Sequence, residues 1–246
     1  MSSVAEHYDR LLGPIYTWAL GDMAVALEHA RAELRESDVQ ARAPGVAVDL
    51  GAGPGVYAIP LAELGFSVIA LDTCAALLEE LKARAGARDI LPVLDDLAPF
   101  RRHCSTPADV ILCMGDTLTH LASLDAVERL FQEVTAALAP GGVFVATFRD
   151  YVSAPLEGAA RFIPVRSDDR RILTCFLEYR ETSVVVHDIL HVRAESGWST
   201  QVSAYPKLRL DPAWAQAALS RLGLLAALAP GPRGMVRLVA RSAHPG

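Results

Sequence analysis

Short apolar runs alternate with amphipathic segments between residues 46 and 148. The runs have the length and composition of buried parallel strands, and they lie at 46–50, 67–71, 89–94, 108–114 and 143–148. Segments with apolar residues at helical spacing separate several of them, at 55–64, 74–85 and 124–138. Because strands that alternate with helices in this rhythm form a parallel sheet with right-handed crossovers, the pattern predicts a doubly wound α/β fold.

The segments that flank this core follow other patterns. Residues 4–36 carry apolar positions at helical spacing, with a break at Gly13-Pro14, and they predict an N-terminal helical cap. After Tyr151, long and partly alternating segments predict antiparallel strands, at 170–180, 182–194 and 198–210. A helix with Asp211 as its N-cap follows, and the chain then returns to the main sheet with a last strand at 235–241.

Composition and charge narrow the classes of function. The chain of 246 residues is 52% hydrophobic and 21% charged, with 17 glycines and 15 prolines, so we expect neither a disordered nor a collagen-like protein. A formal net charge of -6 argues against nucleic acid as the main partner. No apolar stretch is long enough to span a membrane, and no secretory signal is visible, so we expect a cytoplasmic protein. The spacing of the four cysteines matches no metal site, so we expect reduced thiols and no metal.

The strongest local signal is the segment VAVDLGAGPGVYA. Asp49 lies near the end of the first predicted strand, and three glycines precede the next helix, Gly51, Gly53 and Gly55. Glycines at such a place allow a sharp turn and the close approach of a ligand, where open α/β sheets bind their ligands. A dinucleotide fingerprint would need a further glycine where the chain has Val56, so a nicotinamide cofactor is disfavoured. Asp72 ends the second predicted strand, where a carboxylate can accept both ribose hydroxyls of an adenosine.

These features resemble a class I S-adenosylmethionine-dependent methyltransferase over most of residues 45–150. The resemblance rests on the VDLGAGPG loop, on Asp72, on Asp95-Asp96 after the third strand, and on APGGVFVATF at the fifth. It implies a Rossmann-like seven-stranded sheet of order 3-2-1-4-5-7-6, with S-adenosylmethionine as the cofactor. The chain then divides into a helical cap at 1–43, a cofactor-binding core at 44–151, an antiparallel insertion at the substrate site at 152–210, and a return to the core sheet at 211–246.

The resemblance also implies which residues contact the cofactor. In that family the glycine loop contacts the methionine part, the acidic residue of strand two holds the ribose, and the acidic residue after strand three approaches the adenine. The cofactor-binding residues carried over to this chain are Tyr16, Asp49, Gly51, Gly53, Gly55, Asp72, Thr73, Asp96, Leu97, Met114 and His120.

Three further segments resemble the small-molecule enzymes of the glycine N-methyltransferase-like group. They are ILCMGDTLTHL at strand four, ATFRDY at strand five, and YTWALGD near the N-terminus, and the antiparallel insertion is shared as well. The resemblance implies that Arg149 binds a substrate carboxylate and that Tyr151 offers a hydroxyl near the acceptor. It also implies an aromatic lid over the cofactor, for which the chain offers Tyr8, Tyr16 and Trp18.

The chain departs from the glycine enzymes in the acceptor region. Asp116 stands where those enzymes have asparagine, and Asp150 adds a second acid nearby. A carboxylate at this point repels a substrate carboxylate and favours an amine, which argues against glycine itself. We therefore predict Asp116, Arg149 and Tyr151 as the residues that act on the acceptor.

The sequence as a whole predicts N-methylation of a small polar metabolite. Methyl transfer from a sulfonium needs alignment and the exclusion of water, and it needs no metal. Two alternatives stay open: O- or C-methylation of a natural product or pathway intermediate, and a non-enzymatic module that binds adenosylmethionine in a regulatory or partner role. A homo-oligomer is compatible with the sequence.

Overall fold

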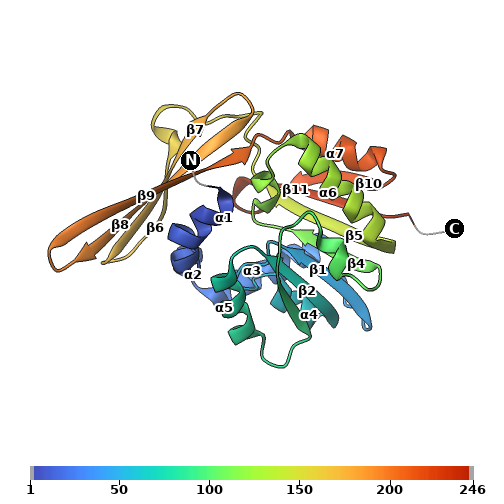
Figure 1. Cartoon of the computed structure of the whole chain (residues 1–246). Coiled ribbons are helices and arrows are strands. Elements are labelled where there is room, and N and C mark those ends of the chain that lie inside the picture. The colour runs from blue at the N-terminus through green and yellow to red at the C-terminus, as the bar shows by residue number, and fades with distance from the viewer. Residues whose placement is uncertain (1–2, 244–246) are drawn as a thin grey trace.

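The computed structural model describes residues 3–243 and contains two β-sheets (Figure 1). The larger has seven strands in the order β10-β11-β5-β4-β1-β2-β3. These strands are β1 (Gly45–Leu50), β2 (Phe66–Asp72), β3 (Ile90–Leu94), β4 (Ala108–Cys113), β5 (Leu138–Phe148), β10 (Leu225–Pro230) and β11 (Val236–Arg241). The strand β11 runs antiparallel to both of its neighbours. Counted within this sheet, the order is 3-2-1-4-5-7-6, which confirms the predicted Rossmann-like methyltransferase fold.

Helices cover both faces of this sheet and bury its apolar side chains. One face packs against α3 (Met23–Glu36), α4 (Ala58–Glu63) and α5 (Ala75–Ala85). The other packs against α6 (Leu124–Ala137) and α7 (Pro212–Arg221). Because both faces of the sheet are buried, the central strands are almost continuous apolar runs. These runs made the strands predictable from the sequence.

The second sheet is the predicted antiparallel insertion. Its strands are β6 (Phe162–Ser167), β7 (Arg171–Tyr179), β8 (Ser183–Ala194) and β9 (Gly197–Leu208), paired in that order. Figure 1 shows this sheet projecting from the α/β core, with the N-terminal segment between the two. That segment comprises α1 (Val4–His7), a π-helical turn (Tyr8–Leu12), a 3-10 turn (Gly13–Ile15) and α2 (Tyr16–Leu20).

Two details differ from the sequence prediction. The N-terminal helical segment is interrupted a second time, at Gly21, because its φ of 104° is incompatible with a helix. The next helix, α3, begins after Asp22, whose side chain accepts a hydrogen bond from the Ala24 amide at 2.8 Å as the N-cap. Strand β6 has no counterpart in the prediction. It is an edge strand with a bulge next to Pro164, so its alternation is broken and it gives no clear period.

Several general features can be stated for residues 3–243. No helix in this part of the chain has the length and apolar character that a membrane crossing requires. The four cysteines are free thiols. Within the same residues, no group of three or more His, Cys, Asp or Glu side chains is arranged to hold a metal ion.

Candidate active site

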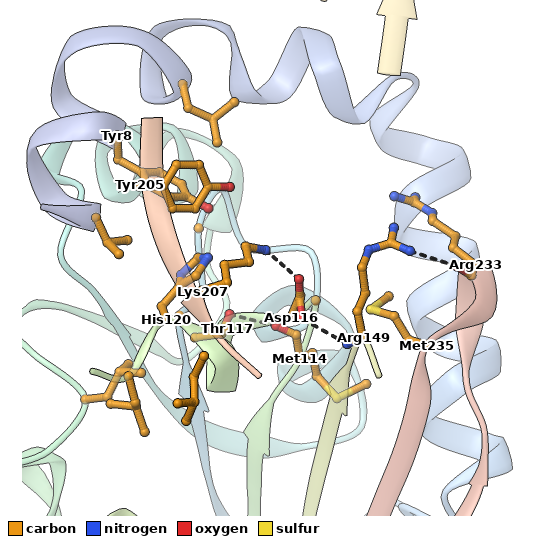
Figure 2. Close-up of a pocket in the computed structure, with 18 of the residues that line it drawn as sticks. Tyr8, Met114, Asp116, Thr117, His120, Arg149, Tyr205, Lys207, Arg233 and Met235 are labelled. Atoms are coloured by element: carbon orange, nitrogen blue, oxygen red, sulfur yellow. Dashed lines mark hydrogen bonds and ion pairs between the residues drawn. The ribbon is translucent and has the colours of Figure 1, made fainter. Parts of the chain in front are cut away.

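A cavity of about 1830 Å³ opens at the carboxyl edge of the seven-stranded sheet (Figure 2). Its wall combines the glycine loop, the ends of β2, β4 and β5, the N-terminal segment, and the inner face of the antiparallel sheet. The volume exceeds the roughly 300–1,000 Å³ of a typical small-molecule site, so it has room for two ligands. The predicted site residues that line it are Tyr16, Gly51, Gly53, Asp72, Thr73, Asp96, Leu97, Met114, Asp116, His120 and Arg149.

The glycine loop is bent over the end of β2 by backbone hydrogen bonds. The amides of Gly51 and Ala52 both donate to the Leu71 carbonyl, at 2.9 and 2.8 Å. A Cβ on Gly51 would lie 2.5 Å from the Thr117 side chain, and its φ is +79°, so only glycine fits there. The amide of Gly53 then donates to the Asp72 carboxylate at 2.7 Å.

Asp72 connects the loop to the start of α5. Its second carboxylate oxygen accepts from the Cys74 amide at 2.8 Å. Burial raises the pKa of Asp72 above its ordinary value, although the Cys74 and Gly53 amides act in the opposite direction. The carboxylate is therefore fixed in orientation and retains lone pairs on the cavity side, as a receptor for hydroxyl groups requires.

Two of the predicted cofactor residues do not line the cavity. Asp49 is buried beneath the loop at 1% exposure, and its Oδ2 has no hydrogen-bond partner among the described residues. A Cβ on Gly55 would collide with Leu81 of α5, so this glycine serves the packing of the loop against that helix. Membership of the glycine motif does not by itself distinguish a residue that faces the ligand from one that supports the loop.

The buried carboxyl of Asp49 predicts an unusual dependence of stability on pH. Burial, followed by the charge of Asp72, raises the pKa of Asp49 to about 7. Between its unfolded pKa near 4 and this value, the native state retains a proton that the unfolded chain has released. The free energy of unfolding should therefore fall as pH rises through this range, by up to about 1.4 kcal/mol per pH unit.

Asp49→Asn should remove this dependence. Urea unfolding of the two proteins at pH 5, 6, 7 and 8 measures it. The difference in stability, variant minus wild type, should grow from pH 5 to 7 and then level off. A difference that stays constant across these pH values would show that Asp49 is already ionised in the native protein.

Asp116 is the most heavily bonded side chain of the site. It has a left-handed backbone, with φ of 76°, and is 4% exposed. Its Oδ1 accepts from the Arg149 amide at 2.9 Å and the Thr119 hydroxyl at 3.0 Å. Its Oδ2 accepts from the Lys207 ammonium at 2.5 Å (Figure 2). The same oxygen accepts from the Tyr151 hydroxyl at 3.0 Å. These four donors fill the acceptor capacity of a carboxylate.

Lys207 is a candidate functional residue that the sequence did not indicate. It lies near the end of β9, and its side chain is 11% exposed on the cavity wall. Burial alone would raise the pKa of Asp116, but the charge of Lys207 and the Arg149 amide outweigh it and hold the pKa below its ordinary value. The sequence carries no signal that brings β9 to β4, because the two residues are 91 positions apart.

Tyr151 does not line the cavity. It is 4% exposed, and its hydroxyl is directed to Asp116 rather than to the cavity. The predicted direct contact with the acceptor therefore has no support in this geometry. The side chain supports Asp116, and burial and the nearby carboxylate keep the phenol protonated by raising its pKa.

His120 presents a neutral imidazole to the cavity. Burial first, and the charge of Lys207 second, lower the pKa of His120 to about 3. Its Nε2 is buried and has no hydrogen-bond partner within residues 3–243. The rings of Tyr8 and Tyr205 lie edge-on to it, with centroids 5.9 and 5.8 Å away (Figure 2). A ligand that fills the cavity can satisfy this nitrogen.

The N-terminal segment covers the cavity with some of the predicted lid residues. Tyr8 and Tyr16 line it, with ring centroids 6.1 Å apart. The prediction for Trp18 is wrong. Its indole N–H donates to Asp168 at 2.6 Å and Arg171 stacks on its ring, so it packs against the antiparallel sheet outside the cavity. The helical pattern alone could not show on which side the indole finds a polar partner.

A buried histidine fastens this segment to the antiparallel sheet. His7 is fully buried, and its two ring nitrogens lie 2.9 Å from Asp188 and 2.7 Å from Ser203. Its ring stacks on Tyr205 with a centroid distance of 4.1 Å. The segment that carries Tyr8 and Tyr16 is thus held in place by the antiparallel sheet.

The two acidic residues after β3, Asp95 and Asp96, lie in different environments. Asp95 forms an ion pair with Arg102 and a hydrogen bond of 2.6 Å with the His103 ring, and it is not part of the cavity wall. Asp96 lines the cavity and accepts from the Leu97 amide at 2.6 Å. Of the two acids, Asp96 is the one that can reach a ligand.

Comparison with known proteins agrees with this arrangement. Residues 47–142 match a family described as a methyltransferase domain. A glycine/sarcosine N-methyltransferase of Aphanothece halophytica is 27% identical over 106 residues, and that of Halorhodospira halochloris is 28% identical over 106. In both cases the match covers 42% of this chain and 40% of the relative, so the similarity spans well under half of each protein.

Solved structures resemble the chain over nearly its whole length. An amino pentose methyltransferase of Micromonospora echinaspora, solved with its methyl donor bound, has a TM-score of 0.77 at 16% identity and covers 95% of this chain and 97% of that one. The CcbJ methyltransferase of Streptomyces caelestis has a TM-score of 0.73 at 22% identity and covers 88% and 96%. Residues 47–142 therefore resemble a methyltransferase domain, and the chain shares the fold of these solved methyltransferases.

Proposed function

We propose that this protein transfers a methyl group from S-adenosylmethionine to an amine of a small polar metabolite. The observation that carries the proposal is a single cavity with two unlike ends. At one end the Asp72 carboxylate and the Gly53 amide form a fixed receptor. The other end of the cavity carries a cluster of three charged residues, Asp116, Lys207 and Arg149.

The residues present fit an adenosylmethionine. The glycine loop leaves room at Gly53, where the nearest atom to an added Cβ would be 3.9 Å away on Tyr16, and Asp72 is oriented for ribose hydroxyls. Asp96 lies on the wall at the end of β3, where it can accept from an adenine amino group. Met114 and Leu97 give the apolar surface that a nucleoside needs, and both are largely buried.

When bound, the cofactor supplies an electrophilic methyl group on a sulfonium whose departure as a thioether requires no protonation. The protein's own contribution is to hold the acceptor in line and to exclude water. Tyr8 and Tyr16 close the cavity from the N-terminal side, and His7 fastens their segment to Asp188. The neutral imidazole of His120 can accept a hydrogen bond from an amine without repelling it, because its pKa is lowered far below neutrality.

Nitrogen is favoured as the acceptor atom by the proteins that resemble this chain. Their names describe glycine/sarcosine, sugar and glycopeptide N-methyltransferases. We propose that Arg149 holds an anionic part of the acceptor, and that Asp116 acts on the acceptor by orienting Lys207 and the loop after β4. The cavity of about 1830 Å³ supports an acceptor larger than glycine.

A thermal-shift measurement tests the cofactor. S-adenosylhomocysteine at 100 times its Kd should stabilise the native protein by about 2.7 kcal/mol through mass action, and NAD at the same concentration should not. A shift with NAD and none with S-adenosylhomocysteine would refute the proposal. Incubation of metabolite pools with labelled S-adenosylmethionine, followed by mass spectrometry, then identifies the acceptor. Label that appears only on oxygen or carbon would overturn the assignment to an amine.

A further inference from the structure

We propose that Asp188 binds the amine of the acceptor and takes up the proton that this amine loses on methylation. The inference rests on the proposed function, because it assigns a proton acceptor to the same reaction. Asp188 lies on β8, on the face of the antiparallel sheet that forms a wall of the cavity, and it is 2% exposed. No motif in the sequence had indicated it.

Methylation of an ammonium releases one proton. An ammonium has no free electron pair, so it must lose a proton before its nitrogen attacks the methyl carbon. The new N–C bond then forms as the C–S bond breaks, and the electron pair of that bond stays on the sulfur of the neutral thioether. In a cavity that excludes water, a side chain in contact with the amine has to receive the proton.

Five neighbouring titratable groups of the acceptor half are unsuited to this task. Asp116 already accepts four hydrogen bonds, and Lys207 is its ammonium partner. Burial, followed by the charge of Lys207, lowers the pKa of His120 to about 3, so its imidazole does not retain a proton near neutral pH. Burial raises the pKa of Cys175 and of Tyr205 above their ordinary values, so both are protonated already.

Asp188 has the hydrogen-bonding capacity that these groups lack. Its Oδ1 accepts from the Cys175 thiol at 2.6 Å, and its Oδ2 lies 2.9 Å from the Nε2 of His7. A carboxylate has about four acceptor positions, so about two remain for an amine. Within residues 3–243 no lysine or arginine nitrogen lies within 4.0 Å of this carboxylate, and its basic partner is the His7 imidazole.

Two positioning residues, His7 and Cys175, hold this carboxylate on the cavity wall. His7 is fully buried, and its Nδ1 lies 2.7 Å from the Ser203 hydroxyl. The pairing of β8 with its two neighbours places Cys175 on one side of Asp188 and Ser203 on the other. The contacts from β7 and α1, the latter supported by β9, therefore fix the direction of the side chain, as the alignment of a base with its substrate requires.

Tyr8 connects the position of Asp188 with that of the proposed cofactor. Burial raises the pKa of Tyr8, and nearby charges, among them those of Asp72 and Asp188, raise it further. The phenol is thus within electrostatic reach of the ribose receptor and of Asp188 alike. Its ring also lies beside His120 on the cavity wall, with centroids 5.9 Å apart (Figure 2). An amine held by Asp188 is therefore close to the region between the two ends of the cavity.

Amine binding to the complex with S-adenosylhomocysteine tests the site. Ethylammonium chloride and, as the uncharged comparison, ethanol are titrated into the saturated complex of the full chain by calorimetry. We expect wild type to bind ethylammonium at least about tenfold more tightly than ethanol, and Asp188→Asn to lose this preference. Ser203→Ala is the matched control, because it removes a hydrogen bond of His7 and leaves the Asp188 carboxylate and its donors in place. It should bind ethylammonium within about threefold of wild type.

Three outcomes of this titration would overturn the assignment. They are no binding of ethylammonium by wild type, equal affinities of wild type and Asp188→Asn, and an equal loss in Asp188→Asn and Ser203→Ala. In the last case the carboxylate would act only by fastening His7. If S-adenosylhomocysteine fails to bind wild type, the proposed function fails, and the same titration of the free protein still decides whether Asp188 binds an amine.

The dependence of turnover on pH gives a second test, with the acceptor amine that the labelling experiment identifies. In wild type kcat should be level between pH 6 and 8, because the bound ammonium gives its proton to Asp188. In Asp188→Asn kcat at pH 7 should be about 100-fold lower or less, and it should rise about tenfold per pH unit, because only amine that is already neutral reacts. A wild-type kcat that itself rises tenfold per pH unit in this range would overturn the assignment, even where Asp188→Asn does not fold.

The titratable groups that face Asp188 come from four elements, and they are His7, Tyr8, Cys175 and Tyr205. Burial raises the pKa of the thiol and of both phenols, which keeps their titration above pH 8. The contribution of His7 is measured with Ser203→Ala, which alters a contact of His7 and not of Asp188. Its kcat should stay level between pH 6 and 8. A rise like that of Asp188→Asn would assign the proton to His7 and overturn the role of Asp188.

Discussion

Asp72→Ala should weaken the binding of S-adenosylhomocysteine by about 10- to 100-fold. A hydrogen bond to a charged group contributes about 1.5–3 kcal/mol, and each 1.4 kcal/mol corresponds to a tenfold change in Kd. The carboxylate of Asp72 has two tasks, because it faces the cavity and also accepts the Gly53 and Cys74 amides at 2.7 and 2.8 Å. Its removal therefore takes away a ligand contact and releases the glycine loop.

Calorimetric titration of wild type and variant measures this loss. Asp89→Ala is a suitable control, because Asp89 is an exposed acid that bonds Ser67 and does not line the cavity. The control should bind as wild type does, and its melting temperature shows what the loss of an acid alone does to the fold. If Asp72→Ala binds with unchanged affinity, the cofactor does not use the end of β2, and the adenosine must be placed elsewhere in the cavity.

The cofactor half of the cavity was predictable from sequence because it depends on local chain geometry. Buried strands are visible as apolar runs. The loop after β1 needs glycines, because other residues adopt its positive φ angles only with steric strain. Asp72 follows from its place at the end of β2. What the motif could not show is which of its members face the ligand, and Asp49 and Gly55 turned out to lie behind the loop.

The acceptor half was less predictable because it is assembled from distant segments. Lys207 reaches Asp116 from 91 residues further along the chain, and Arg233 lies on the cavity wall in a turn that the pairing of β11 with β5 places there. Trp18 has the spacing of a lid residue, yet Asp168 supplies a polar partner on the other side. Tyr151 follows the family's segment, yet its hydroxyl is directed to Asp116. Such contacts depend on tertiary packing, which a single sequence does not encode in any local pattern.

The pair of Lys207 and Asp116 should dominate the stability of the acceptor side. Both side chains are nearly excluded from water, at 11% and 5% exposure. Lys207→Met leaves the Asp116 carboxylate buried with its cationic partner gone, which for a buried pair costs about 3–5 kcal/mol. The double variant Asp116→Asn with Lys207→Met removes both charges, and it should recover most of this loss. Urea unfolding of the wild type, Lys207→Met, Asp116→Asn and the double variant completes a double-mutant cycle.

The dependence of this effect on pH gives the sharper test. In wild type the pKa of Asp116 is held below its ordinary value, because Lys207 and the Arg149 amide outweigh burial. Its stabilising contribution is therefore present above the unfolded pKa of about 3.9 and is lost as pH falls through the lower native pKa. In Lys207→Met burial has no opposing ammonium, so the pKa of Asp116 should rise. The native state then binds a proton more tightly than the unfolded chain, and the stability of the variant should fall as pH rises above about 4. The variant's deficit relative to wild type should thus grow between pH 4 and 7. A deficit that is independent of pH would mean that Lys207 contributes through packing and not through its charge on Asp116.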